Sequence, residues 1–576
     1  MTDDSISPPR DAAATDAPAA SSPPSRSRGL GWTIGLWAIG FGLIAPLAAW
    51  MLADLLTDRD ATVNSMVMLG AVSAAALAAV CWLWGYSGWS RGTRMTVTIA
   101  AASLAAGLLF LFPPQWDGAM QVSGFRYRYA PTAEERIAAF VAANPESASV
   151  ADTTDAPPVV AGLDDWPGLL GPQRDGKVLD AAIGADWSVK PPETVWRHPV
   201  GPGWGGFSIV GDRCFTMEQR GEEETIACYD ANTGAPLWSH GERTRFSRIA
   251  PNGGDGPAST PTFHDGAVYS MGATGVVTCL DARTGELRWK RDLFEEGNIT
   301  WGLACSPLVV GDAVVVLPGA AAGEDSAAMG LDLSTGETLW ASGDSPGSYS
   351  SPVEATIAGV PQILAFEADG VRGLSTEGET LWDVPWTNQP QVNAAVPIVS
   401  GDRVFLSSGY NTGAGLYEVS EDDGTGTADE VWRTPNRFKL KFNDAILHDG
   451  FVYGLDEGIL SCIDVETGER MWKKGRYGFG QCLLLGTAEG PPMLLVTCEN
   501  GDLALVAATP DDFEEIVRYS DATEETLLEG VCWNHAAYSR GRLYWRNGTE
   551  AVCVQLADEN AAGDPPAPAD PEAPEV

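Results

Sequence analysis

The residues of this sequence that could do chemistry are polar and aromatic side chains near the starts of successive repeating units. They are Glu218, Arg220, Arg245, Trp301, Lys439, Lys441, Arg476, Trp533 and Asn534, with Gln219 beside the first two. Arginine and lysine form charge-assisted hydrogen bonds with carboxylates, and a few convergent polar groups among aromatic rings are typical of small-molecule sites. If the units bring these side chains around one axis, they could bind an acidic small molecule. They could also be solvated surface charges, or internal pairs such as Arg220 with a neighbouring glutamate.

No other motif with a defined chemistry accompanies these residues. The ten cysteines include no adjacent pair, and the sequence has no Cys-x-x-Cys-His for a c-type haem. The five histidines show no zinc or copper spacing, and there is no Walker loop or His-Glu-x-x-His. A formal net charge of −41 argues against a nucleic-acid partner. The sequence therefore names no catalytic residue and no metal ligand.

A repeated phrase indicates which elements would position the candidate residues. It reads CYDANTGAPLW at 228–238, CLDARTGELRW at 279–289, GLDLSTGETLW at 330–340 and CIDVETGERMW at 462–472. Asp-x-x-Thr-Gly predicts a tight turn whose glycine takes a positive φ, and the tryptophan then ends the next strand against a neighbouring unit. The three cysteines occupy equivalent positions, so we expect small apolar side chains rather than a disulfide framework. We interpret the phrase as packing rather than catalysis.

The spacing of the phrase predicts eight units of four short strands each. The units end at Trp238, Trp289, Trp340, Trp382, Trp432 and Trp472, then near Arg518 and Asp558. Four strands in about 40–50 residues is the size of a β-propeller blade. The stretch 187–200 has a closing tryptophan, Trp196, without a unit of its own, and we expect it to complete the last blade and close the ring. The predicted fold is an all-β, eight-bladed β-propeller over residues 163–558.

Three uncharged stretches precede the propeller. Residues 32–53, 63–86 and 95–112 have 22, 24 and 18 residues, which is about the length that crosses a bilayer. More arginines flank the N-terminal side of these stretches than the opposite side. We assign Arg10, Arg26, Arg28, Arg91 and Arg94 to one side, and Arg59, Arg126 and Arg128 to the other. The bias predicts three transmembrane α-helices in the inner (cytoplasmic) membrane, with the propeller on the periplasmic side.

The remaining segments complete the predicted domain organisation. Residues 1–28 are predicted to be a disordered cytoplasmic tail, 29–112 the three-helix membrane anchor, and 113–162 a linker. Within that linker, Thr132 and Glu135 form a capping-box signature ahead of a short amphipathic helix. Residues 559–576 are an acidic, Pro-rich tail that we also expect to be disordered. We therefore expect one folded extracytoplasmic domain.

The repeats resemble those of the PQQ-like (pyrroloquinoline-quinone) β-propeller family, whose blades carry Ala-x-Asp-x-x-Thr-Gly-x-x-x-Trp. That family includes quinoprotein alcohol dehydrogenases and BamB. DDWPGLLGPQRDG at 164–176 is similar to a motif of membrane-anchored PQQ-like proteins from planctomycete-type bacteria, with Leu169 and Leu170 in place of a Phe-Arg pair. In the dehydrogenases, the family pattern places PQQ between a Cys-Cys disulfide and a tryptophan, beside Ca²⁺. Here the disulfide pair is missing, whereas Trp301 or Trp533 could supply the stacking face.

Two functions follow from this resemblance. The first is a binding or scaffold module, held at the cytoplasmic membrane by its helices, that takes a protein or small-molecule partner at the propeller face. A BamB-like role in cell-envelope protein assembly is consistent with that architecture. The alternative is a membrane-bound quinoprotein dehydrogenase that oxidises an alcohol or sugar with PQQ and Ca²⁺. The missing Cys-Cys pair favours the binding module over the enzyme.

Overall fold

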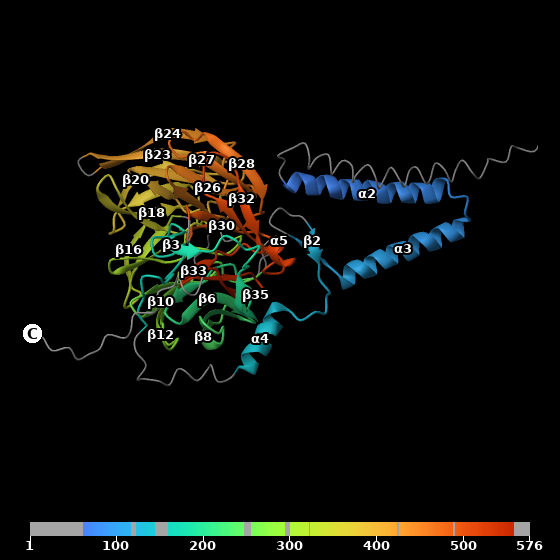
Figure 1. The fold of residues 1–576 in the computed structure, drawn as a ribbon, viewed down its shortest axis with the longest axis horizontal. Helices are drawn as coiled ribbons and strands as arrows, with labels where there is room; N and C mark the ends of the chain where they lie inside the picture. The colour runs from blue at the N-terminus through green and yellow to red at the C-terminus, as the bar shows by residue number, and fades with distance from the viewer. Residues whose placement is uncertain are drawn as a thin grey trace, which may run out of the picture. The chain divides into compact units, whose positions relative to one another are not determined.

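We analysed a computed structural model of the chain (Figure 1). The structure describes residues 61–116, 122–144, 159–246, 255–293, 300–321, 323–422, 425–487 and 490–557. The chain divides into two compact units, residues 1–110 and residues 111–576. The predicted tails, the first predicted span at 32–53 and part of the predicted linker lie outside the described residues.

Eight sheets of the second unit form the predicted eight-bladed β-propeller (Figure 1), and their strands pair antiparallel except for one strand added to the seventh blade. Blades 1 to 4 consist of β5 (Ser208–Val210), β6 (Arg213–Arg220), β7 (Glu223–Asp230) and β8 (Pro236–Glu242); β9 (Thr262–His264), β10 (Ala267–Met271), β11 (Val276–Asp281) and β12 (Leu287–Asp292); β13 (Leu308–Val310), β14 (Ala313–Val316), β15 (Ala328–Asp332) and β16 (Thr338–Ser342); β17 (Val353–Ile357), β18 (Val360–Phe366), β19 (Gly370–Leu374) and β20 (Thr380–Pro385).

Blades 5 to 8 continue the same order and confirm the predicted unit boundaries. They consist of β21 (Ile398–Ser400), β22 (Arg403–Ser408), β23 (Gly413–Asp422) and β24 (Thr425–Thr434); β25 (Ala445–His448), β26 (Phe451–Asp456), β27 (Ile459–Asp464) and β28 (Arg470–Arg476); β29 (Gln481–Thr487), β30 (Met493–Thr497), β31 (Leu503–Ala507) and β32 (Glu515–Arg518); β33 (Ala537–Ser539), β34 (Arg542–Arg546), β35 (Glu550–Gln555) and β4 (Glu193–Pro199).

The ring closes as the sequence predicts. The outer strand of blade 8 is β4, which comes from the N-terminal end of the propeller and pairs antiparallel with β35. Trp196 of β4 lies opposite Cys553 of β35 in this pairing. Because blade 8 contains strands from both ends of the domain, blades 1 and 8 cannot separate without breaking this sheet.

The repeated phrase forms the contact between neighbouring blades. In blade 1, the Asp230 carboxylate accepts hydrogen bonds from the backbone N–H and hydroxyl of Thr233, and Gly234 takes a φ of +70°. A Cβ at Gly234 would lie 2.9 Å from the indole of Trp196, the closing tryptophan of blade 8. The Trp196 Nε1–H donates to the carbonyl of Ala231 at 2.9 Å. The same pattern recurs with Gly285 against Trp238, Gly336 against Trp289 and Gly468 against Trp432. The predicted packing role is thus confirmed.

All ten cysteines are free thiols, and nine of them are buried. Cys228, Cys279 and Cys462 of the repeated phrase belong to apolar clusters between strands. They are small apolar core residues, as the sequence predicts.

A segment that the sequence analysis noted only as a family motif crosses the inner strands of the propeller. Trp166 pairs with Ile209 of β5 through two backbone hydrogen bonds, and the carbonyl of Pro167 accepts from Phe263 of β9. The Arg174 guanidinium donates to the carbonyls of Ser306 and Pro307, ahead of β13. The chain then enters β3 (Lys177–Ile183), which pairs parallel with β29 as a fifth strand of blade 7. We call residues 164–183 the crossing segment.

The crossing segment holds its place through both apolar and charged side chains. Leu169 and Leu170, which replace the family's Phe-Arg pair, are buried in the cluster of blades 4 and 5. Burial lowers the pKa of the Arg174 guanidinium to about 10, with Cys305 and Asp444 nearby acting in the opposite direction. The segment thus ties together the inner strands of blades that lie far apart in the sequence.

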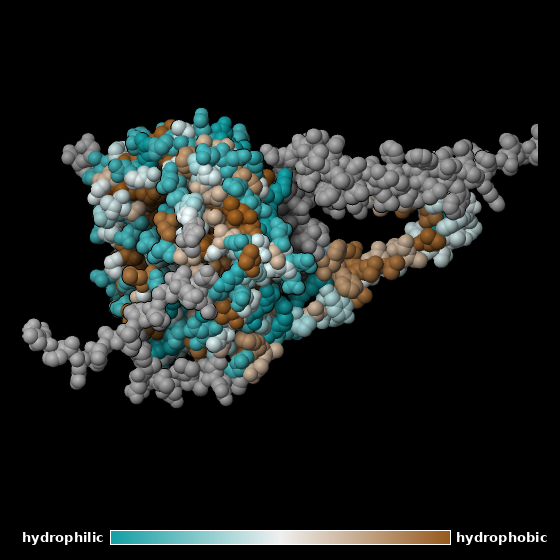
Figure 2. Space-filling model, viewed as in Figure 1, coloured by the Kyte–Doolittle hydropathy of each residue, from teal (hydrophilic) through white to brown (hydrophobic). Residues whose placement is uncertain are grey.

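One helix of the predicted anchor has the length and composition of a membrane span. Within the described residues one helix, α3 (Arg91–Leu111), is long and apolar enough to cross a membrane, and its surface is largely apolar (Figure 2). The second predicted span coincides with α2 (Ala61–Gly85), of which Ser73–Gly85 counts as a shorter apolar helix. The structure therefore supports one of the three predicted transmembrane helices by length and composition. The described apolar part of the second is shorter than a span, and the first lies outside the described residues.

The predicted linker contains more structure than one helix. The predicted amphipathic helix is α4 (Ala133–Ala143), and its capping box forms, with the backbone N–H of Glu135 donating to the Thr132 hydroxyl. Two short strands that the sequence did not predict, β1 (Pro114–Trp116) and β2 (Val122–Phe125), pair antiparallel ahead of it. A short helix, α5 (Tyr519–Thr523), follows blade 7.

Candidate functional site

All nine predicted site residues lie on one face of the propeller. In an antiparallel blade, the starts of strands 1 and 3 and the ends of strands 2 and 4 meet at the same edge. Glu218 and Arg220 end β6, Arg245 follows β8, and Arg476 ends β28. The other five precede a first strand: Trp301 before β13, Lys439 and Lys441 before β25, and Trp533 and Asn534 before β33. We call this edge of the eight blades the upper face.

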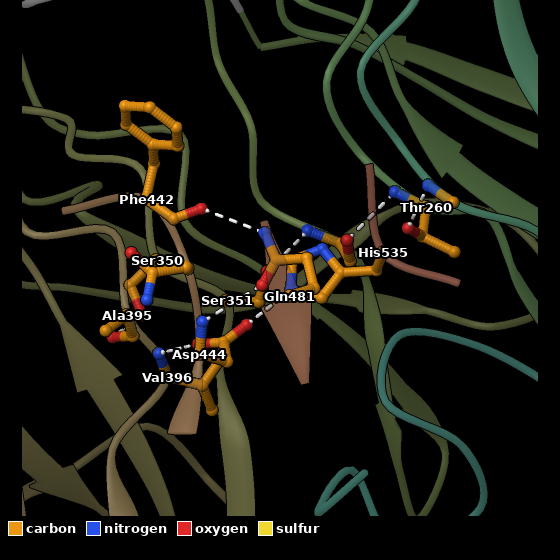
Figure 3. A network of polar contacts seen from close by, with 12 residues as sticks. Thr260, Ser350, Ser351, Ala395, Val396, Phe442, Asp444, Gln481 and His535 are labelled. Carbon is orange, nitrogen blue, oxygen red and sulfur yellow. Dashed lines mark hydrogen bonds and ion pairs between the residues drawn. The ribbon is translucent and has the colours of Figure 1, made fainter. Parts of the chain in front are cut away.

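A closed ring of hydrogen bonds surrounds the axis just below the upper face, and Figure 3 shows part of it. Each link joins the residue before one inner strand to its counterpart in the next blade, over donor–acceptor distances of 2.6–3.1 Å. The successive links are Gly206–Thr260, Thr260–Ser306, Ser306–Ser351, Ser350–Ala395, Val396–Asp444, Asp444–Gln481, Gln481–Trp533 and Asn534–Gly205. Because every buried donor in a link has an acceptor in the neighbouring blade, the ring sets the spacing of the inner strands.

One ion pair spans the ring between non-adjacent blades. The Nε2 of His535 lies 2.7 Å from Oδ2 of Asp444, and Oδ1 of the same carboxylate accepts from the backbone N–H of Val396 (Figure 3). Asp444 is nearly buried, whereas the His535 side chain is 19% exposed. Sequence reasoning missed both residues, since an isolated histidine and an isolated aspartate carry no spacing signal.

Above this ring lies an arc of aromatic side chains from seven blades. The Trp533 ring contacts Trp204 and Phe442, each at 5.0 Å between ring centroids, and Phe442 contacts Phe479 at 5.3 Å. The Lys441 ammonium lies 4.7 Å from the ring of Phe479 and 5.5 Å from that of Tyr410. On the other side, Trp301 meets Tyr349 edge-on at 5.8 Å. We call these eight residues, Trp204, Trp301, Tyr349, Tyr410, Lys441, Phe442, Phe479 and Trp533, the aromatic crown.

Most side chains of the aromatic crown are partly exposed, and hydrogen bonds hold the backbone that carries them. All of its members except Phe479 are partly exposed. The Trp533 Nε1–H donates to Glu499 at 2.7 Å, and the ring of hydrogen bonds below fixes the backbone that carries it. Large, rigid, amphipathic rings of this kind lose little conformational entropy when they bind a partner. The crown can therefore offer a preorganised apolar contact surface.

Glu218 and Arg220 form an internal pair and belong to no open site. The Glu218 carboxylate is fully buried and accepts from Arg220 at 2.6 Å, from the Tyr229 hydroxyl at 2.7 Å and from the backbone N–H of Gly201. Although burial opposes its ionisation, the guanidinium groups of Arg220 and Arg546 hold the pKa of Glu218 below its usual value. The predicted cofactor role of this pair is not supported, because the internal pairing that the sequence left open is what the structure contains.

Two more of the predicted charges, Arg245 and Lys439, have carboxylate partners within the chain. Arg245 contacts Glu134 of α4 at 2.9 Å and Asp255 at 2.7 Å, which fastens that helix to blade 1. Lys439 lies 3.8 Å from Glu457, and Arg476 is exposed at the end of an outer strand. Asn534 is buried, and its side-chain amide donates to the carbonyls of Gly203 and Gly205. The structure thus brings Trp301, Lys441 and Trp533 into the aromatic crown and leaves the other six outside it.

The comparisons with known proteins agree with this architecture. The family model described as outer membrane protein assembly factor BamB, a model of PQQ-like repeats, matches residues 193–474. The repeats of the propeller are similar to those of this family. An outer membrane protein assembly factor BamB from Burkholderia pseudomallei is 26% identical to the PQQ-like propeller over 326 residues, which are 52% of this chain and 75% of that protein.

Solved structures that are similar to this propeller include a BamB and an alcohol dehydrogenase. BamB from Moraxella catarrhalis has 16% identity and a TM-score of 0.44, covering 63% of this chain and 100% of that one. A quinohemoprotein alcohol dehydrogenase from Comamonas testosteroni has 12% identity and a TM-score of 0.47, covering 75% of this chain and 86% of that one. These figures carry no functional argument, so the function has to be inferred from the site itself.

The residues of this PQQ-like propeller do not fit PQQ and Ca²⁺ in the family's arrangement. The sequence has no Cys-Cys pair, and among the described residues no group of three His, Cys, Asp or Glu could hold a metal ion. The Trp533 ring already contacts Trp204 and Phe442, and Trp301 is held against Tyr349. The Glu218 carboxylate is saturated by hydrogen bonds from the protein. We therefore derive no redox step for this propeller.

Proposed function

We propose that the protein is a membrane-anchored scaffold whose propeller binds a protein partner at the upper face, on the periplasmic side of the inner membrane. The three predicted N-terminal helices would hold it there, with α3 as the best-supported span. The family model and the Burkholderia pseudomallei relative, both described as outer membrane protein assembly factors, support a role in cell-envelope protein assembly.

The aromatic crown is the observation that carries this proposal. Protein interfaces concentrate their binding energy in tryptophan, tyrosine and arginine side chains that sit on a preorganised surface. The crown offers three tryptophans, two tyrosines and two phenylalanines around one axis, with the Lys441 ammonium among them. An extended segment of a partner could contact several of these rings at once.

Site-specific photocrosslinking in intact cells tests the location of the partner. A benzoylphenylalanine in place of Trp301 or Tyr410 would report contacts at the crown. Val189 provides a matched control, because it is 80% exposed and precedes the start of an outer strand on the opposite face. We expect one discrete crosslinked product from both crown positions and none from Val189. Equal crosslinking from all three positions would contradict a partner at the crown.

A complementation experiment tests the assembly role separately. Cells that lack the protein should contain less folded outer-membrane protein, and the chain carrying Val189→Ala should restore it. The chain carrying Trp301→Ala and Tyr410→Asn should not, since each lost anchor weakens binding by about 1–2 kcal/mol, or about 5–30-fold. Asparagine suits position 410 because the backbone there has a φ of +56°. Normal levels of outer-membrane protein in the deletion would refute the assembly role.

The alternative function, a PQQ-dependent dehydrogenase, makes a different prediction. Full-length protein in detergent would have to bind PQQ in the presence of Ca²⁺ and reduce a dye in the presence of an alcohol or sugar. We expect no binding by calorimetry up to roughly millimolar PQQ, which corresponds to a free energy weaker than about −4 kcal/mol. Micromolar binding that is lost in Trp533→Ala would favour the dehydrogenase over the scaffold.

A further inference from the structure

The exposed aromatic side chains of this protein are confined to a short part of the chain. Among the described residues, every aromatic side chain that is exposed lies between Trp84 and Tyr129, and none lies in the propeller. They form two groups, which flank helix α3 in the sequence. Trp84, Tyr86 and Trp89 come before it, and Phe110, Phe112, Phe125, Tyr127 and Tyr129 come at its end or after it.

The second group is assembled by the short hairpin that begins the second unit. The backbone N–H groups of Arg126 and Arg128 donate to the carbonyls of Pro113 and Leu111, which extends the pairing of β1 with β2. This brings Tyr127 against Phe112, with ring centroids 5.5 Å apart, and Tyr129 lies 5.7 Å from Tyr127. We call Phe112, Phe125, Arg126, Tyr127, Arg128 and Tyr129 the aromatic patch.

The aromatic patch is costly to leave in water. Phe125, Tyr127 and Tyr129 are 62%, 47% and 65% exposed, and Phe112 is 40% exposed. The rings of Phe112, Tyr127 and Tyr129 form one contiguous surface, and Phe125 is exposed two residues before Tyr127, whereas the propeller keeps all its described aromatic side chains at least partly covered. A contiguous exposed apolar surface of this kind marks an interaction site.

The sequence position of the aromatic patch identifies the partner. It starts at the residue after α3, the helix that is long and apolar enough to cross a bilayer. Tyrosine, tryptophan and phenylalanine rings gather at the two membrane–water interfaces, where the ring contacts acyl chains and the polar edge meets the headgroups. Arg126 and Arg128 add two positive charges to this patch in a chain whose net charge is −41. Guanidinium groups bind phosphate with paired hydrogen bonds.

We propose that the aromatic patch lies in the headgroup layer of a phospholipid bilayer, with its rings at the level of the acyl-chain ends and the two guanidinium groups on lipid phosphates. The patch would then fix the depth and rotation at which α3 leaves the membrane. It would also hold α4, which begins four residues after Tyr129 and fastens to blade 1 through Glu134 and Arg245. This inference rests on the membrane anchoring in the proposed function.

Hydroxyl-radical footprinting of the full-length protein in nanodiscs tests this inference. The nanodiscs contain equal parts of phosphatidylcholine and phosphatidylglycerol, and mass spectrometry measures labelling side chain by side chain. Leu163, which is fully exposed at the start of the propeller, provides the reference for a solvated side chain. We expect Phe125, Tyr127 and Tyr129 to be labelled several-fold more slowly than their exposed fractions predict. Labelling at the rate of freely solvated rings would overturn the proposal.

A charge-reversal variant tests the phosphate contact of the aromatic patch independently of the membrane insertion of α3. Arg126→Glu with Arg128→Glu would repel lipid phosphates, so labelling of Tyr127 and Tyr129 should rise several-fold. Leu104 and Leu108 of α3, which are exposed in the isolated chain, should stay protected in the same sample. Unchanged protection of the tyrosines in the variant would refute the phosphate contact. Labelling of Leu104 and Leu108 in the unmodified protein would instead refute the membrane anchor itself, and with it the proposal.

Discussion

Glu224 offers the sharpest test of the electrostatics in this propeller, because its carboxyl group is buried without a cationic partner. It lies on β7 with a 2% exposed side chain, at the boundary between blades 1 and 2. Its carboxyl oxygens accept from the backbone N–H of Ala273 at 3.1 Å and from the Thr274 hydroxyl at 3.2 Å. Burial raises the pKa of Glu224 to about 7, and these hydrogen bonds offset only part of that shift.

The raised pKa predicts a specific pH dependence of stability. Between about pH 4.5 and pH 7, Glu224 is protonated in the folded state and ionised in the unfolded state, so unfolding releases a proton. Stability therefore falls as the pH rises through this window, and the contribution levels off above pH 7. A shift of about 2.5 pKa units is worth on the order of 3 kcal/mol at 1.4 kcal/mol per unit. Glu224→Gln removes this dependence and should leave the protein more stable above pH 7 by up to that amount.

Thermal and chemical unfolding of the full-length protein at pH 5, 6, 7 and 8 measures this effect. We expect the stabilities of the unmodified protein and Glu224→Gln to diverge steadily from pH 5 to pH 7 and then to run parallel. Glu223→Gln is the matched control, because its side chain is exposed on the same strand and should not change the profile. Parallel profiles for Glu224→Gln and the unmodified protein across the whole range would refute the assignment of a raised pKa to Glu224.

Three further predictions follow from the buried polar groups. Glu218→Ala leaves the guanidinium groups of Arg220 and Arg546 without their carboxylate, so we expect it to lower the free energy of unfolding by about 3–5 kcal/mol. Denaturant unfolding measures this loss, and a loss under about 1 kcal/mol would contradict the internal pairing. Burial raises the pKa of Cys482 and Cys305 to about 12, and we expect the nine buried thiols to react with a thiol reagent at pH 8 only after unfolding; fast reaction of any propeller thiol in the folded protein would refute this. Arg174→Ala removes two hydrogen bonds that together stabilise the crossing segment by about 2 kcal/mol. We expect faster proteolysis within residues 164–176 while the blades stay folded. Unchanged proteolysis would show that other contacts hold the segment.

The propeller could be predicted from the sequence because its signal is local and repeated. Each Asp-x-x-Thr-Gly turn is stabilised within a few residues, as in the hydrogen bonds from Thr233 to Asp230. The tryptophan that follows contacts the equivalent glycine of the next blade, so that a constant spacing in the sequence reports a constant geometry in space. The same logic identified β4 as the closing strand, since Trp196 had the phrase's tryptophan without a blade of its own.

The candidate site was predicted less completely. The nine predicted residues lie on one face, but no sequence signal distinguishes a partly exposed tryptophan from a charged side chain that is paired within the chain. Glu218 and Arg220 looked like ligand-binding groups because both are charged and sit at a strand end, yet Tyr229 and Gly201 complete an internal pair. His535 and Asp444 are 91 residues apart and meet only through the ring. The second predicted span and α3 followed from hydropathy, whereas the hairpin before α4 left no periodic signal.

The sequence by itself therefore determined the number of blades, their boundaries, the closure of the ring and the packing role of the tryptophans. These features depend on turns and strands whose partners are neighbours or regular repeats along the chain. Only the tertiary structure decided which polar side chains are paired with one another. It also decided that residues 164–183 cross the inner strands and that rings from seven blades form one crown. The physical reason is that many of these contacts join residues far apart in the sequence, such as Trp204 and Trp533. Even the short-range pair of Glu218 and Arg220 depends on burial and orientation that no local pattern encodes.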